Sequence, residues 1–468
     1  MLFNSYEFLF VFLPIVLLGY YVLVPKRARL GFITLMSYLF YGWWDWRFCS
    51  LMLISTVIDY QSGKRIHASS DPRVRKRWLL LSIVSNVSLL GFFKYFDLTA
   101  DTANQLLAWF GVGAEPLIPL LNVVLPVGIS FYTFQSMSYS LDIYMGAAKP
   151  ARSPVQFACY VALFPQLIAG PIVRYRDLAD QLVYRTHTWA KCSLGIQFFV
   201  AGLAKKVILA DGAAFLVGDA FEVAAPGLFS AWIGTLAYTM QIYFDFSGYS
   251  DMAVGLGLML GFRLPQNFNS PYKALSITDF WRRWHITLSS WLRDYLYIPL
   301  GGNRLGATRT YVNLLITMLL GGLWHGAHWN FVIWGGFHGA LLAIERMWGK
   351  RGLLTRAPQL IQQSATFLLV MVGWVFFRAE SLGQAGAVFR GMLGFNGVDA
   401  VIHERMATDP LPYILLGISL VGAFCFRNIW EIRWRPNLIW FVTLGSLFVL
   451  SVFVILVNTA SPFLYFQF

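Results

Sequence analysis

The feature that most constrains this chain is a series of long apolar runs without charged residues. The first run, residues 8–25 (FLFVFLPIVLLGYYVLVP), carries no charge at all. A helix needs about 20 apolar residues to cross a bilayer. Only 13% of the 468 residues are charged and 57% are apolar, whereas soluble domains contain about 25% charged residues. The chain is therefore predicted to be an all-α polytopic membrane protein. A soluble enzyme, a secreted disulfide scaffold and a disordered chain are excluded.

Basic residues indicate how the first spans are oriented. Lys26, Arg27 and Arg29 follow the first run, and six more lysines and arginines occupy residues 64–77. Because cytoplasmic loops are enriched in lysine and arginine, both loops are predicted to face the cytoplasm, with the N-terminus outside. A cleaved signal peptide needs a basic segment before its apolar run. The only charged residue before this run is Glu7, so we expect no signal peptide.

Further apolar runs predict additional spans. They lie at about 30–44, 47–62, 78–96, 117–140, 155–172, 193–218, 226–246, 311–324, 329–345, 365–378, 412–427 and 437–457. Several are short or contain proline and glycine, as at Pro165 and Gly170, which is typical of re-entrant or broken helices. Residues 263–310 carry seven basic residues and are too polar to span. We expect about 11 true spans within one membrane-embedded domain, residues 1–468.

The net charge of +13 and the four cysteines do not indicate nucleic-acid or metal binding. In a membrane protein such an excess of basic residues is explained by cytoplasmic loops, so no nucleic-acid partner is expected. Cys49, Cys159, Cys192 and Cys425 lie scattered in apolar stretches without CxxC spacing. They are interpreted as small buried apolar residues, and they predict neither a disulfide framework nor a zinc site.

Four of the seven histidines fall within residues 285–338, and ionisable residues at membrane depth are functional candidates. The pattern of residues 278–298 predicts an amphipathic helix, on which His285 lies at the edge of an apolar stripe containing Trp281. An interfacial helix is the alternative interpretation. His325 stands in the glycine-rich segment 321–339, where His328 would share its helical face and His338 would point elsewhere.

Metal-dependent and triad chemistry are both disfavoured at these histidines. No aspartate or glutamate occurs from residue 295 to residue 344, and a divalent metal in hydrocarbon would need anionic ligands as well as imidazoles. No metal site is therefore expected. A Ser-His-Asp triad lacks its acid, and no GxSxG segment is present. What remains is a buried neutral imidazole suited to general-base catalysis on a hydroxyl that the substrate supplies.

The chain resembles the membrane-bound O-acyltransferase family, in particular the bacterial branch that acetylates exopolysaccharides such as alginate or cellulose. The likeness extends over nearly the whole chain and is most specific in two segments. They are DFWRRWHITLSSWLRDYLYIPLGGN (279–303) and WHG (324–326). It also includes LPVGISFYTFQSMSYSLDIY (125–144), FPQLIAGPIVRYRDLADQ (164–181), YFDFSGYSDMAVGLGLMLGF (243–262) and FLYFQF (463–468).

The resemblance implies a fold and a reaction. The fold is a ring of about 11 transmembrane helices, with re-entrant and interfacial helices, around a central funnel and tunnel. His325 is implied to be the catalytic histidine, and His285 a second catalytic position that orients or polarises the thioester. The candidate donor-binding residues are Trp281, Arg282, Arg283, Arg293 and Trp324. For the arginines, the alternative is that they are topology charges of a cytoplasmic loop.

The expected reaction moves an acetyl group from a cytoplasmic thioester, acetyl-CoA, to a hydroxyl on the other side of the inner membrane of a bacterium. No bound cofactor is expected, since the thioester is a substrate. The resemblance implies two partners, a periplasmic SGNH-type acetyltransferase and a polysaccharide synthesis and secretion complex. Two other classes remain open on the residues alone, a transporter or flippase and a non-catalytic anchor of a secretion complex. Loss of activity in His325→Ala would separate an enzyme from both.

Overall fold

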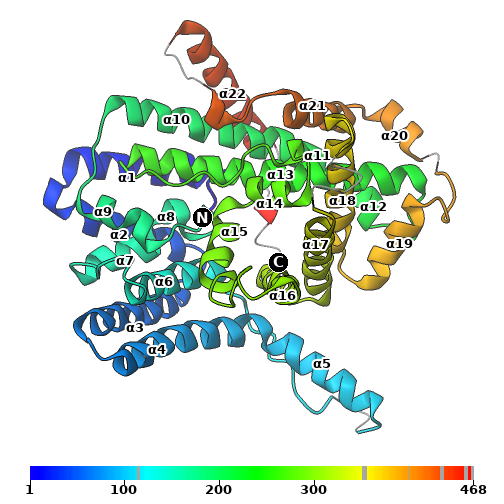
Figure 1. Ribbon diagram of the computed structural model, residues 1–468. Helices are drawn as coiled ribbons and strands as arrows, with labels where there is room; N and C mark the ends of the chain where they lie inside the picture. The colour runs from blue at the N-terminus through cyan, green and yellow to red at the C-terminus, as the bar shows by residue number, and fades with distance from the viewer. Residues whose placement is uncertain (113–115, 350–355, 400, 433–436, 458–461, 465–468) are drawn as a thin grey trace. The chain divides into compact units, whose positions relative to one another are not determined.

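The described residues of the computed structural model are 1–112, 116–349, 356–399, 401–432, 437–457 and 462–464. Within these ranges the chain is helical and contains no strand (Figure 1). The chain divides into two compact units, which we describe separately. The first contains residues 1–192, 257–264 and 326–328, and the second contains residues 193–256, 265–325 and 329–468. The prediction of one embedded domain stays a prediction.

The first unit is built from the N-terminal helices. They are α1 (Leu13–Leu18), α2 (Arg29–Gly42), α3 (Phe48–Ala68), α4 (Pro72–Leu90), α5 (Phe96–Trp109), α6 (Ile129–Tyr144), α7 (Pro154–Ala162), α8 (Phe164–Leu167) and α9 (Tyr175–Val183).

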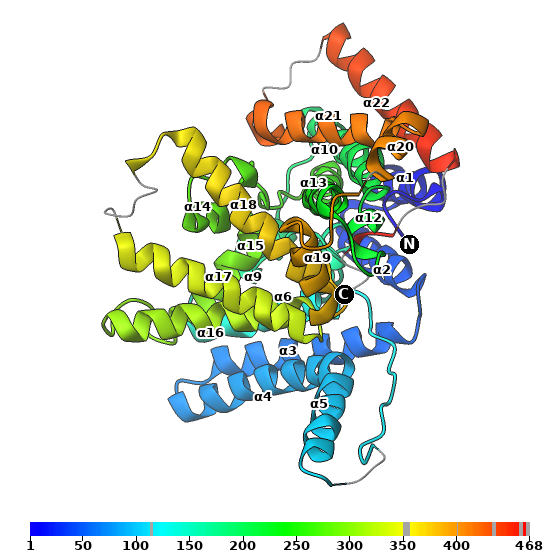
Figure 2. The same cartoon turned by 90° about the vertical axis from the view of Figure 1, so that its right-hand side faces the viewer.

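Helices α3, α4 and α6 pack on one another in this unit, and α3 and α4 lie side by side in both views (Figures 1 and 2). The start of α4 follows from its sequence. Asp71 caps the helix by accepting a hydrogen bond from the Arg73 amide at 2.8 Å, and Pro72 occupies the first turn. Aspartate as cap and proline directly after it are the preferred residues at a helix N-terminus. The basic segment 64–77 therefore comprises the last turn of α3, a short connection and the first turns of α4.

The second unit contains the remaining helices. They are α10 (Trp189–Ala204), which begins in the first unit, α11 (Asp211–Ala214), α12 (Gly218–Phe221), α13 (Leu228–Met259), α14 (Ile277–Arg283), α15 (Ile286–Leu292), α16 (Ala307–His325), α17 (Trp329–Trp348), α18 (Gln359–Arg378), α19 (Leu382–Met392), α20 (Val401–Thr408), α21 (Leu411–Cys425) and α22 (Leu438–Val457).

Helices α16 and α17 pack extensively on one another in this unit, and α18 packs against α17. Figure 2 shows α16 and α17 side by side. Gly322 and Gly335 stand where they cross. A Cβ atom on Gly322 would lie 2.1 Å from the Phe331 carbonyl oxygen, and one on Gly335 would lie 2.3 Å from the Met318 carbonyl oxygen. Only glycine permits this approach of two backbones, as is common between membrane helices.

The structure corrects one predicted span and confirms the break in another. Residues 116–128 are not helical, so the span predicted at 117–140 is wrong, and α6 begins only at Ile129. The span predicted at 155–172 is divided into α7 and α8 at Leu163. This agrees with the break that Pro165 predicts, because proline cannot continue a preceding helix.

Four described helical segments are long and apolar enough to cross a membrane. They are Pro72–Trp109, Trp189–Ala214, Gln359–Arg378 and Leu438–Val457, and Phe8–Leu23 and Leu411–Cys425 are shorter apolar helices. The first run predicted from the sequence is thus a helix over nearly its whole length. The number of 11 spans stays a prediction.

Candidate functional site

His325 is the last residue of α16, three residues after the glycine crossing, and its side chain is only 5% exposed. Three aromatic side chains surround its ring edge to face. The ring centroids of Trp324, Trp334 and Phe377 each lie 5.1 Å from that of the imidazole. These rings come from α16, α17 and α18. The histidine is therefore mostly buried among aromatic rings, and its position depends on how three helices pack.

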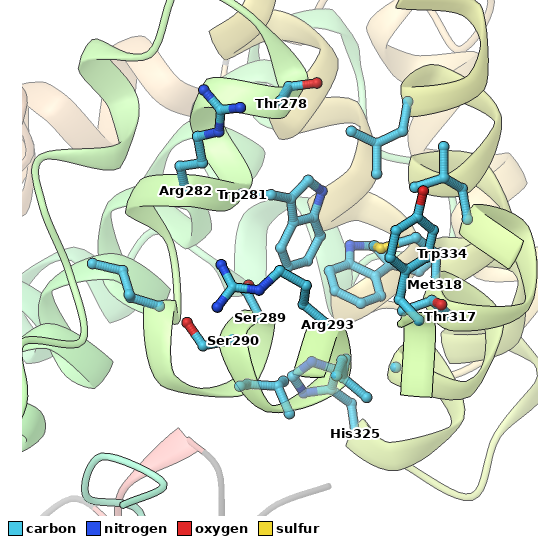
Figure 3. Close-up of a pocket in the computed structure, with 17 residues that line it drawn as sticks. Thr278, Trp281, Arg282, Ser289, Ser290, Arg293, Thr317, Met318, His325 and Trp334 are labelled. Atoms are coloured by element: carbon cyan, nitrogen blue, oxygen red, sulfur yellow. The ribbon is translucent and has the colours of Figure 1, made fainter. Parts of the chain in front are cut away.

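The ring of His325 lines a cavity of about 490 Å³ in the second unit. Figure 3 shows Trp281 and Trp334 in the middle of the lining residues, with Arg282 and His325 at opposite sides of the view. The full lining is Thr278, Trp281, Arg282, Ile286, Leu288, Ser289, Ser290, Leu292, Arg293, Tyr297, Leu314, Thr317, Met318, Gly321, His325, Trp334 and Leu342. A mostly apolar wall with a few convergent polar groups is typical of a small-molecule site.

The cavity wall contains two of the three predicted arginines. Arg282 and Arg293 line it and are exposed, and the Nε of Arg293 donates to Asp294 at 2.7 Å. Arg283 is not among the lining residues. Its Nε donates to Asp279 at 2.9 Å, and its backbone oxygen accepts from the Asn269 amide at 2.9 Å. Arg282 and Arg293 are placed to hold an anion, whereas Arg283 ties down the preceding segment.

The predicted continuous helix over 278–298 is wrong, because it breaks at His285. Helix α14 ends at Arg283 and α15 begins at Ile286. Between them His285 adopts a left-handed backbone conformation with φ 43° and ψ 53°. Such a conformation costs a residue other than glycine about 1–3 kcal/mol and persists only where its surroundings impose it. The helical periodicity used to orient His285 therefore does not apply across this point.

Asn267 imposes this conformation from the preceding segment. Its side-chain oxygen accepts from the Thr287 amide at 3.2 Å and from the Thr287 hydroxyl at 2.9 Å, and its backbone oxygen accepts from the Ile286 amide at 2.9 Å. The same side-chain oxygen lies 3.2 Å from Nδ1 of His285. Because an amide oxygen only accepts, the proton of the neutral imidazole is on Nδ1, and Nε2 carries the lone pair.

His285 is fully buried, and burial lowers the pKa of its imidazole to about 3. Its Nε2 has no hydrogen-bond partner among the described side chains and backbone groups. His285 is absent from the cavity lining. Its ring lies 6.0 Å from that of Trp324 and 4.7 Å from that of Phe246. Trp324, a predicted donor-binding residue, is likewise absent from the lining. Its indole lies between His285 and His325 and contacts both rings.

The other two histidines of the cluster are placed differently from the prediction. His328 does not share a helical face with His325, because α16 ends at His325, and His328 is exposed. His338 is fully buried, and its ring lies 5.2 Å from that of Trp281 and 5.0 Å from that of Trp334. It therefore supports the cavity wall from behind. In the described ranges no three His, Cys, Asp or Glu residues come together as a metal site would require.

Several residues of the site were not predicted from the sequence. Phe377 and Trp334 reach His325 from α18 and α17, and Ser289 and Ser290 add hydroxyls to the cavity. The serines follow His285 within the most specific segment of the resemblance, which is a signal that sequence reasoning had available. For Phe377 no local signal exists, because its role depends only on the packing of α18.

Comparisons with known proteins agree with the predicted resemblance. A model of the membrane-bound O-acyltransferase family matches residues 30–376. The chain is 47% identical to the probable alginate O-acetylase AlgI of Azotobacter vinelandii, over 92% of this chain and 85% of that protein. It is 44% identical to the probable alginate O-acetylase AlgI of Pseudomonas putida, over the full length of both. It is 36% identical to the peptidoglycan O-acetyltransferase of Helicobacter pylori, over 100% of this chain and 98% of that protein.

Proposed function

Because this chain belongs to the membrane-bound O-acyltransferase family and is an acyltransferase, we propose that it transfers acetyl groups to hydroxyls for the acetylation of an extracellular polysaccharide. The names of the relatives support both the acetyl group and the polysaccharide, since they describe O-acetylation of alginate and of peptidoglycan. The observation that carries the chemistry is the position of His325, which lines a cavity with apolar walls and two arginines.

His325 acts in this proposal as the general base. Its imidazole removes the proton from the acceptor hydroxyl as the oxygen attacks the carbonyl carbon of the acetyl thioester. The C–O bond of the ester forms, the C–S bond breaks, and the imidazolium returns its proton to the leaving thiolate. Proton transfer by a positioned group contributes about 10²–10⁴-fold. Three aromatic rings hold the imidazole of His325 at the wall of the cavity.

The donor in this proposal is a cytoplasmic acetyl thioester, acetyl-CoA. Arg282 and Arg293 hold its phosphates, because a guanidinium forms charge-assisted bonds with phosphate oxygens. The two arginines line the same cavity as His325. Trp281, also in the wall, provides an apolar surface for the part of the donor between the phosphates and the thioester. Arg283 is left out of the donor site, since it does not line the cavity that contains His325.

His285 is a positioning residue in this proposal. Its ring contacts Trp324, which contacts His325, so it acts on the base through the indole between them. This replaces direct contact of His285 with the thioester, the role that the resemblance implies. His285→Ala is expected to lower turnover with little change in the KM for the donor, whereas His285→Asn keeps a side chain that can bond to its surroundings and retains more activity. Turnover near that of wild type in both variants would leave His285 without this role.

The acceptor side of the proposal concerns the partner that receives the acetyl group and the membrane in which the chain lies. The chain is placed in the inner membrane of a bacterium with its N-terminus in the periplasm, and it hands the acetyl group to an SGNH-type acetyltransferase of a polysaccharide secretion complex. The basic loops at 26–29 and 64–77 support this orientation. Acetate content of the secreted polymer, measured with and without the SGNH partner, tests the relay.

The decisive experiment compares two histidines that are three residues apart. His325→Ala should abolish release of free thiol from acetyl-CoA by the purified protein and ester-linked acetate in the polymer. His328→Ala is the matched control, because it removes the same side chain from an exposed position, and it should keep wild-type activity. Wild-type thiol release in His325→Ala would refute the general base. In that case a loss of ester-linked acetate would place the defect at transfer to the acceptor and not at the thioester.

A further inference from the structure

A group of basic side chains in the first unit has no acidic partner. It lies where residues 20–29, 184–192 and 259–263 meet, and none of these segments contains an aspartate or glutamate. In the described part of the chain, Arg29, Arg185 and Lys191 form no ion pair. Positive charge alone is expected of a cytoplasmic loop. What distinguishes this group is that its side chains are held in place.

Tyr20 is the centre of the arrangement, and it is fully buried. Its hydroxyl donates to the Leu260 backbone oxygen at 3.2 Å and accepts from the Nε of Arg185 at 2.9 Å. The same hydroxyl lies 2.7 Å from the Nε2 of His187. The Arg185 guanidinium also stacks 4.6 Å from the ring centre of Phe262. The Nε atom and one face of the Arg185 guanidinium are thereby held in place. Its two terminal nitrogens can still donate hydrogen bonds to a ligand.

The Arg29 guanidinium is held over the same aromatic group. It lies 5.0 Å from the ring centre of Tyr20 and 5.7 Å from that of Tyr21, and one terminal nitrogen donates to the Tyr21 backbone oxygen at 3.3 Å. Its Nε is buried without a hydrogen-bond partner. Two guanidinium groups on one tyrosine ring repel each other unless an anion lies between them.

Two more basic groups adjoin the arginines. Burial lowers the pKa of His187, and the charges of Arg185 and Arg29 lower it further. Lys191 donates to the Thr186 backbone oxygen at 2.9 Å and to its hydroxyl at 2.5 Å. A phosphate fits such a group, because arginine binds its oxygens through two parallel bonds.

The surroundings indicate which molecule carries the phosphate. Trp189 is 90% exposed and Tyr184 77% exposed beside the basic group, and Leu23 is 70% exposed before it. Exposed tryptophan and tyrosine between apolar and charged residues are typical of the membrane–water interface, where lipid headgroups lie. We propose that Arg29 and Arg185, which are held against Tyr20, form together with Lys191 a binding site for the phosphate of an anionic phospholipid in the cytoplasmic leaflet.

The test compares two pairs of arginines in the full-length protein. Arg29→Gln/Arg185→Gln removes two charges from the proposed site. Arg73→Gln/Arg77→Gln, the matched control, removes two from exposed positions of the other basic loop. The protein is purified in neutral detergent, and retained phosphatidylglycerol is titrated by native mass spectrometry. Each basic residue near the surface contributes about five-fold to binding. We expect about 25-fold weaker retention for the first pair, because both of its arginines contact the phosphate in this proposal, and a smaller loss for the control, whose arginines lie outside the proposed site.

Three results would overturn the proposal. Equal losses in both pairs would mean that attraction is diffuse, and equal retention of phosphatidylglycerol and phosphatidylcholine would mean that no anionic site exists. Displacement of the lipid by inorganic phosphate alone would assign the site to free phosphate. If the glutamine pair does not fold, Arg185→Lys decides. This variant keeps the positive charge but loses the bidentate geometry of the guanidinium and its stacking on Phe262. Intermediate retention of the lipid would support the site, and wild-type retention would contradict it.

Discussion

Replacement of Gly335 by alanine is the sharpest test of how the fold positions His325. A Cβ atom at this position would lie 2.3 Å from the Met318 carbonyl oxygen and 3.1 Å from the Cα of Leu319. Since Cβ atoms essentially never approach other atoms closer than 3.0 Å, α16 and α17 must separate by about 0.7 Å or more. Met318 lies two turns before His325 on the same helix, so the displacement reaches the imidazole.

The expected effects on stability and activity differ in size. Overpacking costs about 1–3 kcal/mol, and alanine recovers about 1 kcal/mol of helix propensity relative to glycine. The free energy of unfolding should therefore fall by about 0–2 kcal/mol, and the protein should still fold. Turnover is more sensitive, because a misplacement of about 1 Å at a reacting group can cost about 10²-fold. We expect turnover of Gly335→Ala to be reduced about 10- to 100-fold.

The neighbouring glycine provides the control. A Cβ atom on Gly336 would meet only the flexible end of Leu319 at 3.5 Å, which is an ordinary contact. Gly336→Ala has the same gain in helix propensity without the clash, and it should keep wild-type turnover. Thiol release from acetyl-CoA and thermal unfolding, both measured in the same detergent, give the comparison. If Gly335→Ala and Gly336→Ala turn over equally, the close crossing does not position His325, and this reasoning fails.

Three further predictions concern pH, sidedness and metal. The pKa of His285 is lowered to about 3 and is about 6.5 in the unfolded chain, so below pH 6.5 only the unfolded state gains the proton. The contribution of His285 to stability should then fall by about 1.4 kcal/mol per pH unit. The profile of His285→Asn should therefore be less steep than that of wild type, and parallel profiles would contradict the assignment. Cysteines introduced at 64–77 should react with an impermeant reagent only from the cytoplasm, and labelling from the periplasm would invert the proposed topology. Turnover should survive chelation, since a metal at His325 is not expected, and zinc lost together with activity would disprove this.

Local sequence properties were sufficient to predict the class of protein and the principal candidate residue. Hydropathy is a local quantity, so the first apolar helix and the broken segment around Pro165 were both predicted. The segment around His325 was identified because it combines glycine, tryptophan and histidine without any acid, and the family follows from that segment together with residues 279–303.

The tertiary structure alone decided how the second histidine is placed. Helical periodicity gives a side chain's direction only while the helix continues, and the helix stops at His285 because Asn267, 18 residues earlier, bonds to Thr287 and lies against the imidazole. The same holds for Phe377, which reaches His325 from α18. Composition predicted that the chain enters a membrane, and the resemblance of two segments to a known family indicated which histidine to consider. Contacts between distant segments determined what surrounds that histidine, because no local pattern encodes which residues from separate helices will meet.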